Sequence, residues 1–393
     1  MRIRVAIVTA CTLASAAQSL HADPRVPVDD REVVERLPVA PGAEAQELRA
    51  LRAALAQTPG DLGLAVRVAR GYVAIGRSTG DPRYAGYAQA ALAPWWHLAD
   101  PPIEVQVLRA TLRQRVHDFD GALADLDAVL ARAPRNAQAR LTRATVLTVQ
   151  SRLDEAAQEC ARLKGLVDEL IALACSENVG GLTGRLRQSE ARLRAALARS
   201  TDTDPGTHSW VAAGLAEMAE RAGNTEAAAA GFRDALAADP DDVYSLAAYA
   251  DQLLDHDRPE AVIRLLKART RVDGLLLRYA LAAQRLGRDD ALSSIEQLRA
   301  RFDVSRRRGD RVHLREEARF LLHLARDVPG ALTVAKENWS VQKEPADARI
   351  LLEAALAARD EAWRRVVESW VALHHLEDAK LTNMLRKSNP IRN

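Results

Sequence analysis

Aromatic residues are scarce in this sequence. Six Trp, six Tyr and four Phe account for 4% of 393 residues, although hydrophobic residues reach 48%. The apolar surface therefore consists mostly of Ala, Leu and Val, which suits closely packed helices better than a β-sandwich. The composition predicts an all-α fold.

An excess of charge is also missing, because 55 Lys and Arg are balanced by 53 Asp and Glu. No overall field then attracts the chain to nucleic acid or to anionic lipid. Beyond the N-terminus, no stretch is long and apolar enough to be a membrane helix. We therefore expect no nucleic-acid partner and no stable membrane insertion.

Local signatures of catalysis or metal binding are absent from the sequence. "HHLED" at 374–378 is not HExxH, since its adjacent histidines point to different sides of a helix. "GGLTGR" at 180–185 lacks the length and the lysine of a phosphate loop, and we interpret it as a helix stop and turn. The arginine-rich "SRRRGDR" at 305–311 is interpreted as a solvated loop, and phosphate binding is the alternative. We expect no catalytic residues, no metal and no cofactor.

The N-terminus reads "MRIRVAIVTACTLASAAQSLHADP", with Arg2 and Arg4 before a short apolar stretch and then small residues. This order is typical of a secretory signal peptide. Cleavage after Ala16 or Ala22 fits, and we favour residues 1–22 as the signal. The motif around Cys11 resembles a lipoprotein lipobox, but the apolar stretch before it is short. The sequence predicts a periplasmic or secreted product.

Cysteine is scarcer still than the aromatics, since the chain has three and only Cys160 and Cys175 remain once a signal containing Cys11 is removed. An oxidising compartment would allow these two to form a disulfide. The alternative is that both are small buried apolar residues.

Proline content and helical periodicity divide the remaining chain into three parts. Four prolines in residues 23–42 predict an extended, Pro-rich lead-in. Residues 43–376 have helical periodicity almost throughout, and we assign them to an array of helical repeats. Residues 377–393 are assigned to a C-terminal tail.

A repeated unit is clearest in residues 103–136, where Ala110 marks a close helix contact, "HDFDGA" makes a turn and Pro134 ends the second helix. The next unit has Ala144 and "SRLDEA" in the same places, so that the spacing from Ala110 to Ala144 is 34 residues. Further copies centre on Ala216 and Ala250, again 34 residues apart, and looser ones on Ala69, Ala280, Ala318 and Ala354, with spacings that range from 30 to 41.

These units resemble tetratricopeptide repeats, which have a period of 34 residues, a small residue in each helix and a closing proline. The most specific match is "GNTEAAAAGFRDALAADPDD" at residues 223–242. The resemblance implies a right-handed α-solenoid of antiparallel helix hairpins, eight to nine of them over residues ~45 to ~376. It also implies a concave face, lined by the first helix of each hairpin.

If the family's geometry holds, several side chains point into this concave face. They are acidic in the middle of the array and basic further along, so a partner with segregated charge is implied. The predicted partner-binding residues are Trp210, Glu217, Glu220, Tyr244, Asp251, Asp255, Arg315, Arg319 and His323.

One repeat, between Gly165 and Thr203, is degenerate because Glu177 occupies the position of the small residue. In the repeat pattern, Cys160 lies on the second helix of the preceding unit and Cys175 on the first helix of the degenerate one. A disulfide would therefore join the two units where we expect packing to be poorest.

Residues 78–96 insert a longer turn into the first full unit and gather four aromatics, Tyr84, Tyr87, Trp95 and Trp96. Rigid aromatics near one end of a scaffold can anchor a partner. The alternative is that they cap the N-terminal edge of the solenoid.

The leading hypothesis is an exported scaffold that binds a protein or peptide through its concave face, in an envelope assembly or accessory role. An enzyme or enzyme accessory with a site in the degenerate repeat or the C-terminal segment is the alternative. A third hypothesis is self-association through the aromatic N-terminal edge.

Overall fold

A computed structural model describes residues 28–29, 31–32, 43–200 and 203–388. The predicted signal peptide (1–22) lies outside the described residues, as does most of the lead-in (23–42). The chain forms two compact units, residues 1–47 and residues 48–393. All that follows concerns the second unit, apart from the first residues of α1.

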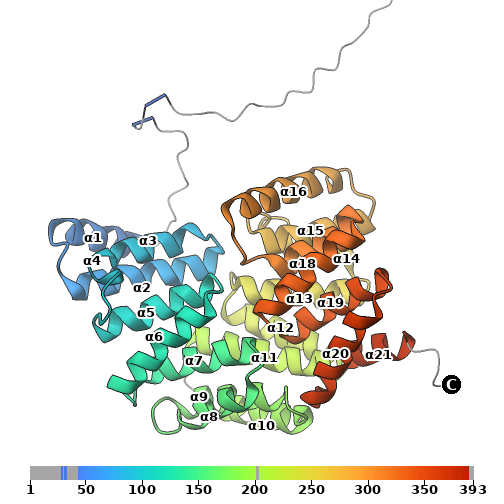
Figure 1. The fold of residues 1–393 in the computed structure, drawn as a ribbon, viewed down its shortest axis with the longest axis horizontal. Helices are drawn as coiled ribbons and strands as arrows, with labels where there is room; N and C mark the ends of the chain where they lie inside the picture. The colour runs from blue at the N-terminus through green and yellow to red at the C-terminus, as the bar shows by residue number, and fades with distance from the viewer. Residues whose placement is uncertain (1–27, 30, 33–42, 201–202, 389–393) are drawn as a thin grey trace, which may run out of the picture. The chain divides into compact units, whose positions relative to one another are not determined.

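The described part of the chain is helical and has no strand; its one β-bridge joins Lys164 to Val167. This confirms the predicted all-α fold (Figure 1). In chain order the helices are α1 (Ala43–Gln57), α2 (Leu62–Thr79), α3 (Arg83–Ala91), α4 (Ala93–Trp96), α5 (Ile103–Arg115), α6 (Phe119–Arg132), α7 (Ala137–Val149), α8 (Leu153–Ala161), α9 (Glu169–Gly180), α10 (Leu186–Arg199), α11 (Pro205–Arg221), α12 (Thr225–Ala238), α13 (Val243–Asp255), α14 (Pro259–Leu266), α15 (Asp273–Arg285), α16 (Ala291–Arg308), α17 (Leu314–Phe320), the π-helical turn η1 (Leu321–Ala325), α18 (Val328–Val341), α19 (Pro345–Ala357), α20 (Glu361–Leu373) and α21 (Ala379–Lys387).

Within the described residues, these helices pair into nine successive hairpins, α2–α3, α5–α6, α7–α8, α9–α10, α11–α12, α13–α14, α15–α16, α17–α18 and α19–α20. The first helix of eight of them carries the small residue that the sequence pattern predicts, and it is almost completely buried in each. These residues are Ala69, Ala110, Ala144, Ala216, Ala250, Ala280, Ala318 and Ala354.

Each hairpin turn contains a residue with a left-handed backbone, which lets the chain reverse between two helices. Glycine takes this conformation without steric cost, and other residues do so less readily. In "HDFDGA" the residue is His117, with φ 60°, and in "GNTEAA" it is Gly223, with φ 79°. The other hairpin turns use Gly80, Ser151, Gly184, Asp257, Gly287, Arg326 and Arg359.

Helix starts are fixed by side chains that cap the first free backbone N–H groups. Asn136 caps α7, Asn224 caps α12 and Asp242 caps α13, each by accepting a hydrogen bond from a backbone N–H three residues on. The cap of α13 matters for the site below, because it sets the position of Tyr244, the second residue of that helix.

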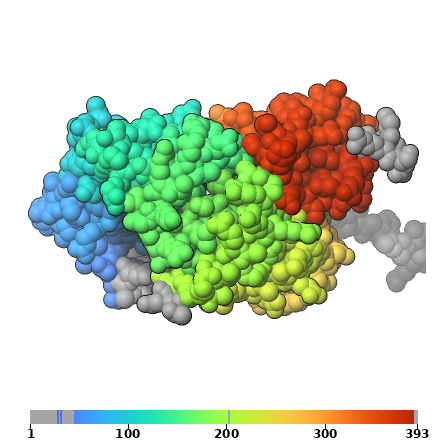
Figure 2. All heavy atoms as spheres, turned by 90° about the horizontal axis from the view of Figure 1, so that it is seen from below, coloured from blue at the N-terminus to red at the C-terminus, as the bar shows by residue number. Residues whose placement is uncertain are grey.

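The second unit curls so far that hairpins distant in sequence come into contact. Lys343 donates its backbone N–H to the carbonyl of Val149 at 2.8 Å, and Glu377 accepts from the backbone N–H of Leu186 at 2.9 Å. Trp370 Nε1 donates to Ser151 Oγ at 2.8 Å. In Figure 2 the C-terminal helices (red) lie directly against the hairpins near residues 150–230 (green).

The chain beyond residue 376, which the sequence analysis assigns to a tail, includes the helix α21. Its Asp378 caps the helix, and Leu381 is buried in the core of the C-terminal hairpins. Ala379 also approaches Gly223 in the turn between α11 and α12. The last helix thus packs against the middle of the array.

Candidate binding surface

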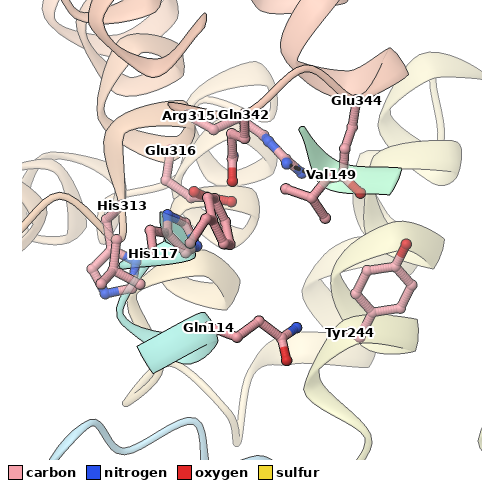
Figure 3. A pocket seen from close by; sticks show the side chains of 11 residues that line it. Gln114, His117, Val149, Tyr244, His313, Arg315, Glu316, Gln342 and Glu344 are labelled. Atoms are coloured by element: carbon pink, nitrogen blue, oxygen red, sulfur yellow. Dashed lines mark hydrogen bonds and ion pairs between the residues drawn. The ribbon is translucent and has the colours of Figure 1, made fainter. Parts of the chain in front are cut away.

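The curled array forms an open central cavity of about 390 Å³. It is lined by residues of four hairpins and of the segments that connect α16 to α17 and α18 to α19. Figure 3 shows Gln114 and Tyr244 on one side of it, opposite His313, Arg315 and Glu316. The lining residues are Gln114, His117, Phe119, Val149, Tyr244, Val312, His313, Arg315, Glu316, Gln342 and Glu344.

Tyr244 is the most accessible large side chain of the cavity. It keeps 57% of its surface accessible although protein surrounds it, so it faces open space rather than packed atoms. Its hydroxyl donates to Glu217 Oε1 at 2.5 Å. Burial raises the pKa of Glu217, and the neighbouring Glu217 charge raises the pKa of Tyr244 well above its usual value.

Arg315 lies across the cavity and is held by two carboxylates. Its guanidinium donates to Asp347 Oδ1 and to Glu344 Oε2, both at 2.6 Å. Burial alone would lower the pKa of Arg315, but Asp347 and Glu344 outweigh it and raise that pKa further. Because Asp347 and Glu344 neutralise its charge and accept from its Nε and Nη2, Arg315 is a weak site for an anion.

Burial moves two other titratable groups of the cavity, His117 and Glu344, towards their neutral forms. Burial lowers the pKa of His117, which favours a neutral imidazole, and burial raises the pKa of Glu344. Glu316 lies 3.6 Å from Arg278. The cavity can therefore donate and accept hydrogen bonds and fits a polar or cationic side chain better than a phosphate.

Beyond the cavity, an ion-pair network joins the middle of the array to its C-terminal hairpins. Asp251 binds Arg278 at 2.7 Å and also binds Arg319. Burial would raise the pKa of Asp251, but the two arginines lower it to about 2. Asp255 binds Arg349 at 2.6 Å and Lys380 at 2.5 Å. These two cations likewise hold the pKa of Asp255 far below its usual value, against the effect of burial.

Most of the partner-binding residues predicted from the sequence take part in these contacts. The predicted segregation of charge is present, with acids on α11 and α13 and bases on α17, but one of the acids, Asp251, pairs with one of the bases, Arg319, inside the chain. His323 contacts Glu353 at 2.8 Å, and Glu220 lies 2.5 Å from Lys380. Trp210 is 38% exposed on α11.

Three cations of this network were not among the predicted residues: Arg278, Arg349 and Lys380. Arg349 lies five residues before Ala354. The repeat pattern did not predict that a side chain at this position points into the concave face. Lys380 lies in the predicted tail. A search for isolated basic residues on the first helix of each hairpin would have found the two arginines.

The aromatic segment forms part of the first hairpin's packing. The rings of Tyr84 and Tyr87 lie 6.0 and 5.4 Å from that of Tyr72. Trp95 and Trp96 are half-buried against the first apolar cluster of the unit. Tyr87 remains 45% exposed and is the most accessible of the four predicted anchors.

Cys160 and Cys175 are joined by a disulfide, with their Cα atoms 5.4 Å apart. Cys160 lies on α8 and Cys175 on α9, so the bond links the second helix of one hairpin to the first helix of the next. Both sulfurs lie in an apolar cluster with Leu163 and Val179.

A search of the described residues finds no group of three or more His, Cys, Asp or Glu side chains placed to hold a metal ion. The same part of the chain contains no helix with the length and apolar character needed to cross a membrane.

A family model of the tetratricopeptide repeat matches residues 107–169 and 183–243. This match supports a tetratricopeptide repeat assignment for the helices α5 to α8 and α10 to α12. A comparison with curated proteins finds no match.

Solved structures with a similar fold include a tetratricopeptide repeat protein from Parabacteroides merdae, at 13% identity and a TM-score of 0.34, covering 80% of this chain and 99% of that one. The human IFIT1 dimer with PPP-AAAA is similar at 16% identity and a TM-score of 0.46, covering 88% and 85%. The APC/C hetero-tetramer Cut9-Hcn1 is similar at 12% identity and a TM-score of 0.42, covering 88% and 75%. The likeness is one of fold alone.

Proposed function

We propose that this chain is an exported tetratricopeptide-type scaffold that binds a protein or peptide partner through its concave side, in an envelope assembly or accessory role. The observation that carries the proposal is Tyr244, a large side chain that remains 57% accessible inside the curled array. An aromatic residue in a pocket is a common anchor of protein interfaces.

The central cavity supports the same proposal by its size and chemistry. A volume of about 390 Å³ lies at the lower end of the range for ligand sites and has room for a side chain of a bound peptide. Gln114 and Glu344 line it together with Tyr244 and offer hydrogen bonds to such a side chain.

The test is a pull-down from an extract of the producing cell's envelope, with the purified chain as bait. We expect one stoichiometric protein with the wild type, and at least a tenfold weaker interaction with Tyr244→Ala. The matched control is Leu292→Ala, at a side chain that is 73% exposed on α16 and remote from the cavity. Equal capture by all three proteins would contradict binding at the cavity.

Export is supported by the N-terminal sequence and by the disulfide, which persists in oxidising compartments. We expect the mature protein to begin at Asp23 and to contain no free thiol when it is denatured without reductant. N-terminal sequencing and thiol counting on protein purified from the periplasm or the medium test this. Two free thiols in each chain would remove the disulfide as support for export.

We also propose that the chain is not itself an enzyme, as expected for a scaffold of this repeat family. Turnover of any compound in a panel of hydrolase substrates would contradict this, provided that the activity co-purifies with the chain and disappears in a variant of the degenerate repeat or of the C-terminal segment.

A further inference from the structure

Three carboxylates form a stripe along the first helices of two adjacent hairpins. Glu220 lies at the end of α11, and Asp251 and Asp255 lie on α13; we call these three residues the acidic stripe. Their side chains are 14%, 26% and 11% exposed. Carboxylates so far removed from water need cations or hydrogen-bond donors nearby.

Most of the cations that meet this need come from the C-terminal hairpins. Arg319 on α17 binds Asp251, from 68 positions further along the chain. Arg349 on α19 donates two bonds of 2.6 Å to Asp255, with 94 positions between them. Lys380 on α21, 125 positions after Asp255, lies 2.5 Å from both Asp255 and Glu220. The C-terminal hairpins therefore occupy the stripe.

Apolar packing joins α13 to α17 and η1, since Leu253, Phe320 and Leu324 share one buried cluster, but it contributes little to the contacts of α19–α21 with the stripe. The buried apolar cluster of α17–α21 runs from Leu314 to Leu381 and, among the described residues, includes no residue of α11 or α13. From the middle of the array only Leu182 packs against it. The contacts of Arg349 and Lys380 with the stripe are made by charged side chains, which can be exchanged for an equivalent set of charges, whereas an apolar core cannot.

Glu220 shows that the stripe has unused capacity. Both of its carboxylate oxygens are buried and accept no hydrogen bond of regular geometry. Lys380 approaches one of them closely and neutralises the charge, but it does so at an angle outside that of a hydrogen bond. A further N–H donor at this position would satisfy a buried acceptor.

We propose that the acidic stripe is the docking surface for a basic segment of the partner, and that Arg319, Arg349 and Lys380 occupy it in the free chain. This inference rests on the proposed function. The incoming arginines or lysines replace internal ones of the same chemistry, and the C-terminal hairpins move away from α11 and α13. The stripe is the fixed half of the contact because its acids lie on two adjacent helices, whereas the cations come from three separate helices.

The test uses a fluorescein-labelled hexa-arginine peptide as the probe and fluorescence anisotropy as the readout. Arg349→Gln with Lys380→Gln frees Glu220 and Asp255, while Arg319 still pairs with Asp251. We expect this variant to bind the probe at least tenfold more tightly than the wild type, because two of the three internal competitors no longer have to be displaced. Small-angle X-ray scattering should show a larger radius of gyration for the same variant. Equal affinity of wild type and variant would overturn the inference.

The matched control is Arg152→Gln with Arg288→Gln, which changes the net charge equally. Both residues form exposed pairs with a near neighbour in sequence, Glu155 or Asp290, far from the stripe. An equal gain in affinity here would overturn the inference, since it would trace the gain to net charge. A fourfold variant, Glu220→Gln and Asp255→Asn added to the first pair, removes the two acids together with their cations, and Glu353, which also loses Arg349, keeps its contact with His323. It should fold and bind the probe no better than the wild type.

The pull-down separates this inference from the proposed function. Partner capture by wild type and Arg349→Gln/Lys380→Gln alike, with no gain for the probe, would overturn the inference and leave the scaffold function standing. A tenfold gain for the probe without capture of any protein would support the basic docking surface and count against the proposed function alone.

Discussion

The hairpins α9–α10 and α11–α12 are neighbours in sequence, yet they bring their helices together differently. In α11–α12 the close approach is at Ala216, where a Cβ added to Gly231 would lie 2.9 Å from the Ala216 Cβ. In α9–α10, Glu177 stands at the equivalent position and reaches out to Arg192 at 3.1 Å.

The close approach in α9–α10 has moved to Gly180, three residues after Glu177. A Cβ at Gly180 would lie 2.5 Å from the Oγ of Ser189 on α10. The degenerate hairpin is therefore not loosely packed; it crosses almost one helical turn further along. The comparison teaches that a repeat can lose its signature residue and keep its architecture when another small residue takes over one turn away.

The largest expected effect comes from placing glutamate, the residue found at 177 in α9–α10, at the equivalent position of α11–α12. Ala216→Glu puts a carboxylate at a fully buried position, against α12 and without a cation, and should lower the free energy of unfolding by about 4 kcal/mol. Urea unfolding followed by circular dichroism measures this. A loss below 1 kcal/mol would mean that the two hairpins tolerate the same residue and that the comparison fails.

Removal of the disulfide should have the next largest effect. The bond closes a loop across a sequence separation of 15, and the chain-entropy model gives about 3 kcal/mol for such a loop. Cys160→Ala with Cys175→Ala should lower the urea midpoint accordingly, and reductant should do the same to the wild type. As a control, reductant should leave the double variant unchanged. An unchanged midpoint in the variant would show that α9–α10 does not depend on the covalent link.

Gly180→Ala tests the shifted crossing point directly. The new methyl group would meet Ser189, so we expect a loss of about 2 kcal/mol in spite of the higher helix propensity of Ala. Gly86→Ala in α3 is the matched control, since no atom lies within 4 Å of its Cβ position, and it should stabilise the chain by about 0.5 to 1 kcal/mol.

Ser189→Ala added to Gly180→Ala should recover part of the loss, because it removes the atom that the new methyl group meets. No recovery would place the strain elsewhere. Both double and single variants can be compared by the same urea titration.

These two hairpins also show which parts of the structure the sequence could predict. The eight buried alanines follow from a local pattern, because each marks contact between neighbouring helices, and the sequence analysis identified all of them. The sequence analysis did not identify Gly180, because the repeat pattern assigns the close contact to a fixed position in each unit. The point at which two helices cross can lie further along both helices. The sequence analysis missed Arg349 and Lys380 for another reason: they act between hairpins far apart in sequence, and the small rotation added at each hairpin decides which of these meet.

Acid should weaken the middle of the array more than the degenerate hairpin α9–α10. The disulfide that holds α9 does not titrate, whereas the ion pairs of α13, the helix that follows α12, do. The pKa of Asp251 is lowered to about 2, so its ion pairs stabilise the fold above its ordinary pKa and this stability is lost as the pH falls from about 4 to 2. The amount is about 2 kcal/mol. The pKa of Glu353 is also lowered to about 2, by His323 and Arg349 against the effect of burial, and adds to the loss.

The pKa shifts of Glu217 and Glu344 have the opposite sign. Burial raises their pKa values, so their ionised forms weaken the fold at neutral pH and this penalty is relieved as the pH falls. Stability should therefore rise slightly below neutrality and then fall steeply under pH 4. Urea midpoints at pH 7, 5 and 3 measure this, and Asp251→Asn should flatten the lower limb. A profile with no loss at pH 3 would contradict the role of these pairs.

The smallest expected effect is that of Glu177→Ala, the reverse of Ala216→Glu. It places the small residue of the tetratricopeptide pattern in the degenerate hairpin. It should change the free energy of unfolding by less than about 1 kcal/mol, because it removes a buried charge and its partner Arg192 is 55% exposed and remains solvated. Arg192→Ala should cost more, about 1 to 3 kcal/mol, since it leaves the Glu177 carboxylate buried without a cation. Urea titrations of both single variants and of the double variant measure the coupling. If Glu177→Ala proves the more destabilising of the two, the carboxylate itself supports the shifted crossing, and Gly180 alone does not account for it.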